Sequence, residues 1–148
     1  MKKKICILDY GSGNIYSLAC ALKRLEVDFV ITNETVNIID STHLIIPGVG
    51  SFDSCMSKIY SKDLIKSIYH FKKTNKPILG ICVGMQILST FGFENKKSKG
   101  LDLINGEVDI ISRGPSLNLR QDVKSISSFD FIDKVKKVSE IHSIKFEN

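Results

Sequence analysis

The sequence predicts an α/β fold in which helices flank a mainly parallel sheet. Short apolar runs, such as residues 4–8 and 43–46, alternate along the chain with segments whose apolar residues have helical spacing. Turns that contain glycine follow several of these runs, as expected of strand ends. This alternation is typical of βαβ units, which bind ligands at the carboxyl ends of their strands. A length of 148 residues with 43% hydrophobic residues suits one compact core.

The first third of the chain predicts three strands with one clear helix between the first two. The expected elements are a strand at 4–8, a turn at 11–14, a helix at 15–25, a strand at 28–32, a short helix or strand at 33–39, and a strand at 43–46 that ends in Pro47-Gly48-Val49-Gly50. The strands read as unbroken apolar runs because a parallel sheet is covered on both faces.

A long amphipathic segment dominates the middle of the chain. Residues 53–73 carry apolar side chains on one side and lysines on the other, which predicts one helix. The remaining expectations are a strand at 77–81, a helix that begins at 85–88, a polar loop at 92–100 and a strand at 107–111.

Composition excludes several functional classes. The net charge of +5 rests largely on lysines on helix faces and around a loop, with only three scattered arginines, so a solvated surface is favoured over nucleic-acid binding. No apolar run approaches the roughly 18 residues of a membrane span, and the one behind Met1-Lys2-Lys3-Lys4 is too short for a signal peptide. We therefore expect a cytoplasmic protein that binds neither nucleic acid nor membrane.

Metal-ligand spacing is absent. The four cysteines include no CxxC pair, and the three histidines lie far apart in the sequence. We expect no metal, no organic cofactor and, in a reducing compartment, no disulfide. Cys6, Cys20 and Cys55 fit buried or half-buried apolar positions.

Cys82 stands in a sequence that predicts a nucleophile. Gly80-Ile81-Cys82-Val83-Gly84 has the pattern G-x-C-x-G and lies between a predicted strand and a predicted helix. Such a turn exposes the thiol at a helix N-terminus, where the partial positive charge favours an anionic sulfur, and leaves the N–H of Val83 for an oxyanion. The alternative is a buried cysteine in a glycine-rich turn. By similar reasoning, the loop Gly48-Val49-Gly50 can offer a second N–H or can be a plain turn.

Four segments resemble the class I (triad) glutamine amidotransferases, and among them the glutaminase subunits of imidazole glycerol phosphate synthase. They are Asp9-Tyr10-Gly11-Ser12-Gly13-Asn14, the stretch from Ile46 to Phe52, the nucleophile segment from Pro77 to Leu88, and the stretch from Gly100 to Val108. The resemblance implies the family's α/β fold, similar to flavodoxin. It also implies L-glutamine as substrate, ammonia as product and a (β/α)8-barrel cyclase subunit as heterodimer partner.

The resemblance also implies roles for individual residues. Cys82 would attack the glutamine amide, while Val83 and the loop Gly48-Val49-Gly50 would stabilise the oxyanion. Gln86 and Glu94 match positions that hold the substrate, with the Glu94 carboxylate suited to the α-ammonium; an ordinary loop acid is the alternative. Asn14 is a candidate residue of the partner interface, or a helix N-cap.

The match covers residues 1–111, which we interpret as the amidotransferase core, and residues 112–148 form a divergent segment. The family's late motifs, among them the F-H-P-E that carries the catalytic histidine and glutamate, are not intact there. His142 is one candidate base; alternatively, Lys145-Phe146-Glu147 is a remnant of F-H-P-E. We therefore expect C-terminal elements of the fold to be missing, as in the first three quarters of a domain of roughly 200 residues. Without a base we expect weak or no glutaminase activity from this chain alone.

Three functional hypotheses follow. The first is an ammonia-supplying glutaminase subunit of imidazole glycerol phosphate synthase in histidine biosynthesis, impaired by loss of the triad's histidine and glutamate. The second is a paralogous subunit that supplies a sugar amidotransferase in surface-polysaccharide synthesis. The third is a non-catalytic docking or regulatory protein.

Overall fold

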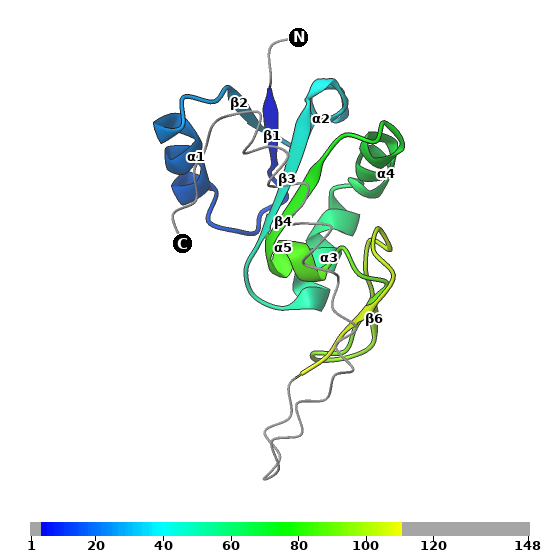
Figure 1. Ribbon diagram of the computed structural model, residues 1–148. Helices are drawn as coiled ribbons and strands as arrows, with labels where there is room; N and C mark the ends of the chain where they lie inside the picture. Colours follow the sequence, from blue (N-terminus) through cyan, green and yellow to red (C-terminus); the bar gives the residue numbers. More distant parts are fainter. Residues whose placement is uncertain (1–3, 111–148) are drawn as a thin grey trace, which may run out of the picture.

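A parallel sheet of four strands organises the protein, as the sequence predicts. The computed structural model describes residues 4–110. The strands β1 (Ile5–Leu8), β2 (Phe29–Thr32), β3 (His43–Gly48) and β4 (Ile78–Cys82) lie in the order β2-β1-β3-β4. Every neighbouring pair is parallel, with Cys6 opposite Val30 and Leu44 in the register. All four carboxyl ends therefore lie at one edge of the sheet, which is the lower end in Figure 1.

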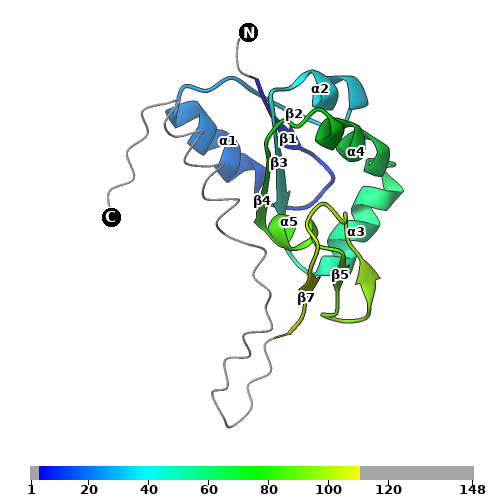
Figure 2. The same ribbon diagram turned by 45° about the vertical axis from the view of Figure 1, so that its right-hand side comes forward.

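Helices cover the two faces of the sheet unequally. Figures 1 and 2 show α1 (Ile15–Arg24) on one side and α3 (Phe52–Ser61) and α4 (Ile65–Lys73) on the other. The strand periodicity of two divides the core in the same way. Ile7 and Ile45 pack with Ala19 and Leu22 of α1. Their strand neighbours Cys6, Leu8, Leu44 and Ile46 belong to the larger cluster with Ile38, Met56, Ile59, Ile68 and Phe71.

The segment between β2 and β3, for which the sequence allows either a short helix or a strand, folds as a short helix, α2 (Thr35–Asp40). Its buried residue Ile38 faces the larger cluster. The Lys76 ammonium donates to the carbonyls of Ile39 and Ser41 at the end of α2, at 2.7 and 2.9 Å. These bonds satisfy carbonyl groups that a helix C-terminus leaves without partners inside the helix.

The prediction of one helix over 53–73 is wrong, because the chain breaks between α3 and α4. Asp63 has a φ of 51°, in the left-handed region that interrupts a right-handed helix. The N–H of Asp63 bonds to the Tyr60 carbonyl and that of Leu64 to the Ile59 carbonyl. Leu64 is nevertheless buried, so the apolar pattern continues through the break and hides it from a search for periodicity.

The chain makes a sharper turn after β4 than the sequence suggests. The next helix, α5 (Val83–Gln86), begins at Val83 instead of at residues 85–88 and has only four residues. Gly84 packs directly on the end of β3, where a Cβ atom would overlap the Ile46 carbonyl oxygen. The absence of a side chain at Gly84 therefore allows the turn to lie against the sheet.

A small second sheet lies beside the lower end of the first (Figure 2). It contains β5 (Phe91–Gly92), β6 (Ser98–Lys99) and β7 (Glu107–Val108) in the order β6-β5-β7. The expected loop at 92–100 is thus a short antiparallel hairpin, and the strand expected at 107–111 is Glu107–Val108. β5 and β6, with two residues each, are too short to show a strand pattern in a polar segment of the sequence.

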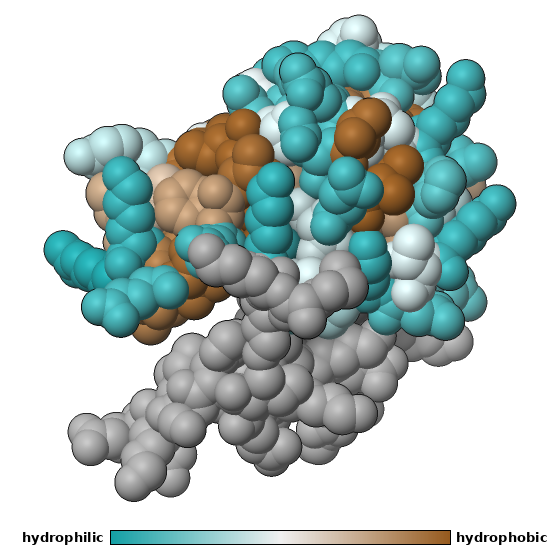
Figure 3. Space-filling model, turned by 90° about the horizontal axis from the view of Figure 1, so that it is seen from above, coloured by the Kyte–Doolittle hydropathy of each residue, from teal (hydrophilic) through white to brown (hydrophobic). Residues whose placement is uncertain are grey.

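The face of the molecule drawn in Figure 3 is mostly hydrophilic. In Figure 3, hydrophobic side chains gather mainly on the α1 side of the molecule. Leu25, at the end of α1, and Ile31 of β2 are exposed by 52% and 42%. Among residues 4–110, no helix is both long and apolar enough to cross a bilayer.

The contact between Gly84 and β3 leads to a stability prediction. We expect Gly84→Ala to lower the free energy of unfolding by about 3 kcal/mol or to prevent folding, because the new methyl group meets backbone that cannot move aside. The matched control is Gly11→Ala. Gly11 has a φ of +84°, but a Cβ atom added there would have no neighbour within 4 Å, so only the backbone strain of about 1–2 kcal/mol applies. Urea unfolding followed by circular dichroism measures both, and equal losses would contradict this account.

Candidate active site

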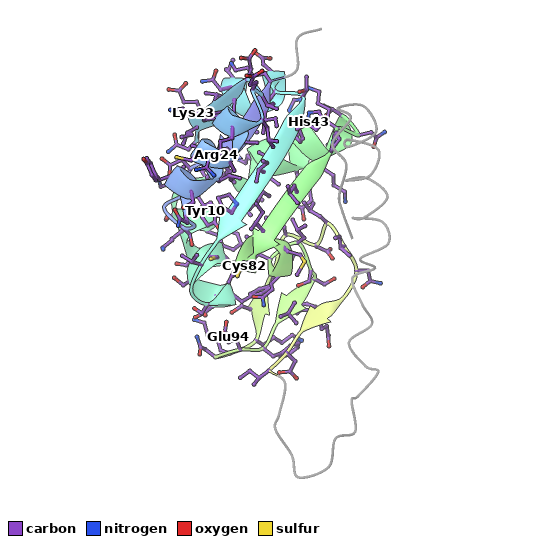
Figure 4. The ribbon with its side chains drawn as sticks, turned by 60° about the vertical axis from the view of Figure 1, so that its left-hand side comes forward. Tyr10, Lys23, Arg24, His43, Cys82 and Glu94 are labelled. Carbon is purple, nitrogen blue, oxygen red and sulfur yellow. The ribbon has the colours of Figure 1, made fainter. Side chains whose placement is uncertain are left out.

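Cys82 ends β4 in a strained backbone conformation. Its φ of 55° and ψ of −122° are unusual for a residue with a side chain, and the residue is exposed. Strain of this kind, at a strand-to-helix turn, is the geometry of a nucleophile elbow. Figure 4 shows Cys82 at the lower end of the sheet, near the labelled Tyr10 and above Glu94.

Glycines on both sides of the thiol make the elbow possible. A Cβ atom on Gly80 would lie 2.6 Å from the Met85 nitrogen and from the Gly84 carbonyl oxygen. A Cβ atom on Gly48 would meet the Val83–Gly84 peptide. The prediction that glycines flank the nucleophile for steric reasons therefore agrees with the packing around Gly80 and Gly84.

Val83 is the first residue of α5 and is buried, with its carbonyl accepting the N–H of Ile87 at 3.0 Å. Because α5 is a single turn, its dipole is small, and the local N–H groups matter more than the helix as a whole. The N–H of Val83 directly follows the thiol in the chain, which is the usual place for one oxyanion donor in an elbow.

The loop after β3 lies beside the thiol. Gly48 is the register partner of Cys82 in the sheet. The buried hydroxyl of Tyr10 donates to the Pro47 carbonyl, and the Ser12 hydroxyl donates to the Val49 carbonyl at 2.9 Å. The N–H of Val49 points back to the Ser12 oxygen at 3.2 Å. In this arrangement Ser12 engages both polar groups of Val49.

The anchor residues are themselves enclosed. Ser12 and Cys55 are buried, and the Ser12 oxygen lies 3.3 Å from the Cys55 sulfur. Burial, together with contact to Cys55, raises the pKa of Tyr10 well above its usual value, so its hydroxyl remains a donor at neutral pH. Burial also raises the pKa of Cys6 to about 11, which makes this thiol a poor nucleophile. All four cysteines are free, and Cys82 alone is exposed.

Glu94 comes from the second sheet, and Gln86 comes from the short helix that follows the elbow. Glu94 lies in the connection between β5 and β6, is exposed, and accepts the N–H of Phe52 at 2.9 Å through Oε2. Gln86 is half-buried and ends α5, one turn after the thiol. Both residues therefore belong to segments that meet at the carboxyl end of the sheet.

Asn14 caps a helix, which is the simpler of its two interpretations. Its side chain accepts the N–H of Ser17 at 3.1 Å at the start of α1. Asn14 is also exposed, so a role at a partner interface stays a prediction.

The part of the chain that the structure describes brings no histidine to the thiol. His43 begins β3 and lies at the opposite end of the sheet in Figure 4. His70 is exposed on α4, beside Lys66 and Lys73. The candidate base His142 and the segment Lys145-Phe146-Glu147 lie outside the described residues, as does the divergent segment 112–148. Within residues 4–110, no three histidine, cysteine or acidic side chains are grouped to hold a metal ion.

Sequence reasoning missed four residues with contacts around the site. Tyr10 and Ser12 anchor the loop after β3, and Asp53 and Asn95 form a bond beside Glu94. The first two follow β1, which lies next to β3 in the sheet, so their position in a glycine-rich turn was a usable signal. Asp53 and Asn95 carried no such signal, because their contact joins a helix and a loop that are 42 positions apart in the chain.

Comparison with known proteins agrees with this geometry. A family described as glutamine amidotransferase class-I matches residues 6–148. The imidazole glycerol phosphate synthase subunit HisH of Bacillus cytotoxicus is 42% identical over 104 residues, covering 70% of this chain and 50% of the relative. HisH of Halalkalibacterium halodurans is 41% identical over 102 residues, or 69% and 48% of the two chains. HisH of Lactococcus lactis is 42% identical over 106 residues, or 72% and 52%.

The chain spans about half the length of the curated relatives that it matches. The family match extends over most of its residues, and the elbow at Cys82 has the backbone geometry that this chemistry needs. The resemblance inferred from the four sequence segments is confirmed, and the chain belongs to the class I glutamine amidotransferases.

Proposed function

We propose that this chain is the ammonia-producing part of a glutamine amidotransferase, with Cys82 as its nucleophile. The observation that carries the proposal is the positive φ of Cys82 in a glycine-flanked turn, beside the loop at Gly48. This conformation directs an exposed thiol out of the sheet edge, while buried Cys6 and Cys55 remain inside the core.

The proposed reaction has two stages. The Cys82 sulfur adds to the side-chain carbonyl carbon of L-glutamine, and the carbonyl electron pair moves to oxygen. The carbon–nitrogen bond then breaks, and the nitrogen leaves with an added proton as ammonia, which yields a γ-glutamyl thioester. Water hydrolyses this thioester to glutamate and restores the thiol.

Backbone N–H groups stabilise the oxyanion in this proposal. Val83 supplies one donor, and the loop Gly48-Val49-Gly50 supplies the other. The N–H of Val49 bonds to the Ser12 oxygen at 3.2 Å, so it must leave that oxygen before it can face a substrate. Ser12 therefore opposes the catalytic arrangement of this peptide.

Gln86 and Glu94 bind the substrate in this proposal. The Glu94 carboxylate engages the N–H of Phe52 with one oxygen, which leaves the other for the α-ammonium of glutamine. Gln86, one turn after the nucleophile, holds the substrate from the other side.

Proton transfer is the incomplete part of the proposed mechanism. Loss of ammonia from the tetrahedral intermediate needs a general acid, and no histidine among residues 4–110 lies at the thiol. His142 remains the candidate for this role. We infer weak or no turnover of glutamine by this chain alone, although it carries the proposed nucleophile and the proposed oxyanion donors.

The relatives favour one partner. All three relatives described above are named as subunits of imidazole glycerol phosphate synthase. We propose that this chain likewise supplies ammonia, in the cytoplasm, to a cyclase subunit of that synthase with a (β/α)8-barrel fold, in histidine biosynthesis. The exposed Asn14, at the carboxyl end of β1, is a candidate residue of the shared interface.

The first test separates the role of the nucleophile from that of the general acid. The γ-(4-nitrophenyl) ester of L-glutamate releases a phenolate that needs no protonation, so the thioester can form without a general acid. We expect a rapid burst of one 4-nitrophenol per chain, and a γ-glutamyl adduct on Cys82 by mass spectrometry. Cys82→Ala should lose the burst, whereas Cys20→Ala, at a half-buried cysteine, should keep it. A folded chain without a burst would favour the non-catalytic hypothesis.

The second test concerns the anchor at Val49. Ser12→Ala removes the hydrogen bond that the Val49 N–H must break before it can face a substrate. We therefore expect the burst with the same ester to be about three- to tenfold faster. This range corresponds to the net free energy of one hydrogen bond. Stopped-flow absorbance measures the rate constant, and circular dichroism checks the fold. A slower burst at unchanged stability would mean that Ser12 holds the loop in its catalytic arrangement.

A further inference from the structure

Two consecutive residues of the hairpin between β5 and β6 reach across to the start of α3. Glu94 accepts the N–H of Phe52 at 2.9 Å, and the Asn95 amide donates to the Asp53 carboxylate at 3.0 Å. The two bonds run side by side, because each joins positions 42 apart in the chain. They connect the loop that carries Glu94 to the helix that directly follows the loop Gly48-Val49-Gly50.

The bond to Phe52 fixes one half of the Glu94 carboxylate. Oε2 is occupied by a backbone donor, so the side chain cannot rotate freely. Glu94 is exposed, which leaves its second oxygen open to a ligand. Figure 4 shows Glu94 at the same end of the molecule as Cys82.

Asp53 is held firmly enough to act as an anchor. Hydrogen bonds from the Ser51 hydroxyl and from Asn95 lower the pKa of Asp53, so the carboxylate stays ionised at neutral pH. Asp53 also lies in the first turn of α3, where a negative charge is favourable. The acceptor of the Asn95 amide is therefore an oriented charge on a helix, and a hydrogen bond to a charged group is stronger than one between neutral groups.

The base of the hairpin cannot replace this anchor. Gly92 lies against the Phe52 ring, where a Cβ atom would overlap ring carbons, and Lys97 lies over the Phe91 ring at 4.4 Å. These contacts fix β5, which ends two residues before Glu94. At the tip, Asn95 forms the side-chain bond that ties the connection to α3.

We propose that Asp53 and Asn95 are positioning residues that hold Glu94 in place to bind the α-ammonium group of the substrate. This inference rests on the proposed function, in which Cys82 and Glu94 act on one amino-acid substrate. Neither Asp53 nor Asn95 touches the substrate; they act through Glu94.

Two matched esters test the inference. The γ-(4-nitrophenyl) ester of L-glutamate carries the α-ammonium group. The mono-(4-nitrophenyl) ester of glutaric acid has the same chain and the same free carboxylate but lacks that group. The half-saturation concentration and the limiting rate of the burst are measured for both. In Asn95→Ala and in Asp53→Ala we expect the half-saturation concentration to rise about fivefold for the amino ester only. The limiting rate should stay unchanged, because the nucleophile is untouched.

A swap and a remote control separate positioning from general stability. The double variant Asp53→Asn with Asn95→Asp restores an amide–carboxylate bond with donor and acceptor exchanged, and should return the half-saturation concentration to within about twofold. The control is Asn37→Ala, which removes a similar bond of 2.7 Å to Glu34 near the start of α2. It should change the half-saturation concentration for neither ester. Melting temperatures verify that all variants are folded.

The outcomes distinguish this inference from the proposed function. If the unsubstituted chain shows no burst, or does not distinguish the two esters, the proposed function itself fails. If the unsubstituted chain prefers the amino ester and Glu94→Gln loses that preference, while Asn95→Ala and Asp53→Ala keep it, only the positioning role is overturned. An equal rise in half-saturation concentration for both esters would also overturn the positioning role, because a general distortion of the site would then explain the effect.

Discussion

The close contact between the turn after β4 and the end of β3 is the constraint on which the site depends. Gly84 lies so near the Ile46 carbonyl that no side chain fits between them, and Gly48 meets the Val83–Gly84 peptide in the same way. With the turn held this tightly, Cys82 is forced to a φ of 55°. The strain at Cys82 thus follows from packing between two neighbouring strands, and it fixes where the thiol leaves the sheet.

A second layer of contacts comes from β1. Tyr10 and Ser12 follow the end of this strand and bond to Pro47 and Val49, 37 positions away in the chain. Because β3 lies between β1 and β4, residues at its end can contact both neighbours. The loop after β3 is therefore held by residues that follow β1 on one side and adjoins Cys82 on the other, so the orientation of the Val49 peptide depends on both neighbours.

The structural features that could be predicted are those that depend on a local pattern in the sequence. Unbroken apolar runs located all four strands of the main sheet, and G-x-C-x-G located the elbow, because each pattern reflects nearby chain geometry. The break at Asp63 escaped prediction because buried Leu64 continues the apolar pattern of α3 into α4. The bonds from Ser12 to Val49 and from Asn95 to Asp53 escaped prediction because they form only when segments that are distant in the chain meet.

In the proposed mechanism, the residues that shape the backbone of Cys82 are distinct from those that would move protons. The contacts that set the backbone of Cys82 and the loop at Gly48 lie around the carboxyl ends of the strands, whereas His43 lies at the opposite end of the sheet. Addition of a thiolate to a carbonyl needs the first set, and departure of ammonia needs a proton donor as well. In the proposed mechanism the two capacities can therefore be separated, and the choice of leaving group should determine which of them limits the reaction.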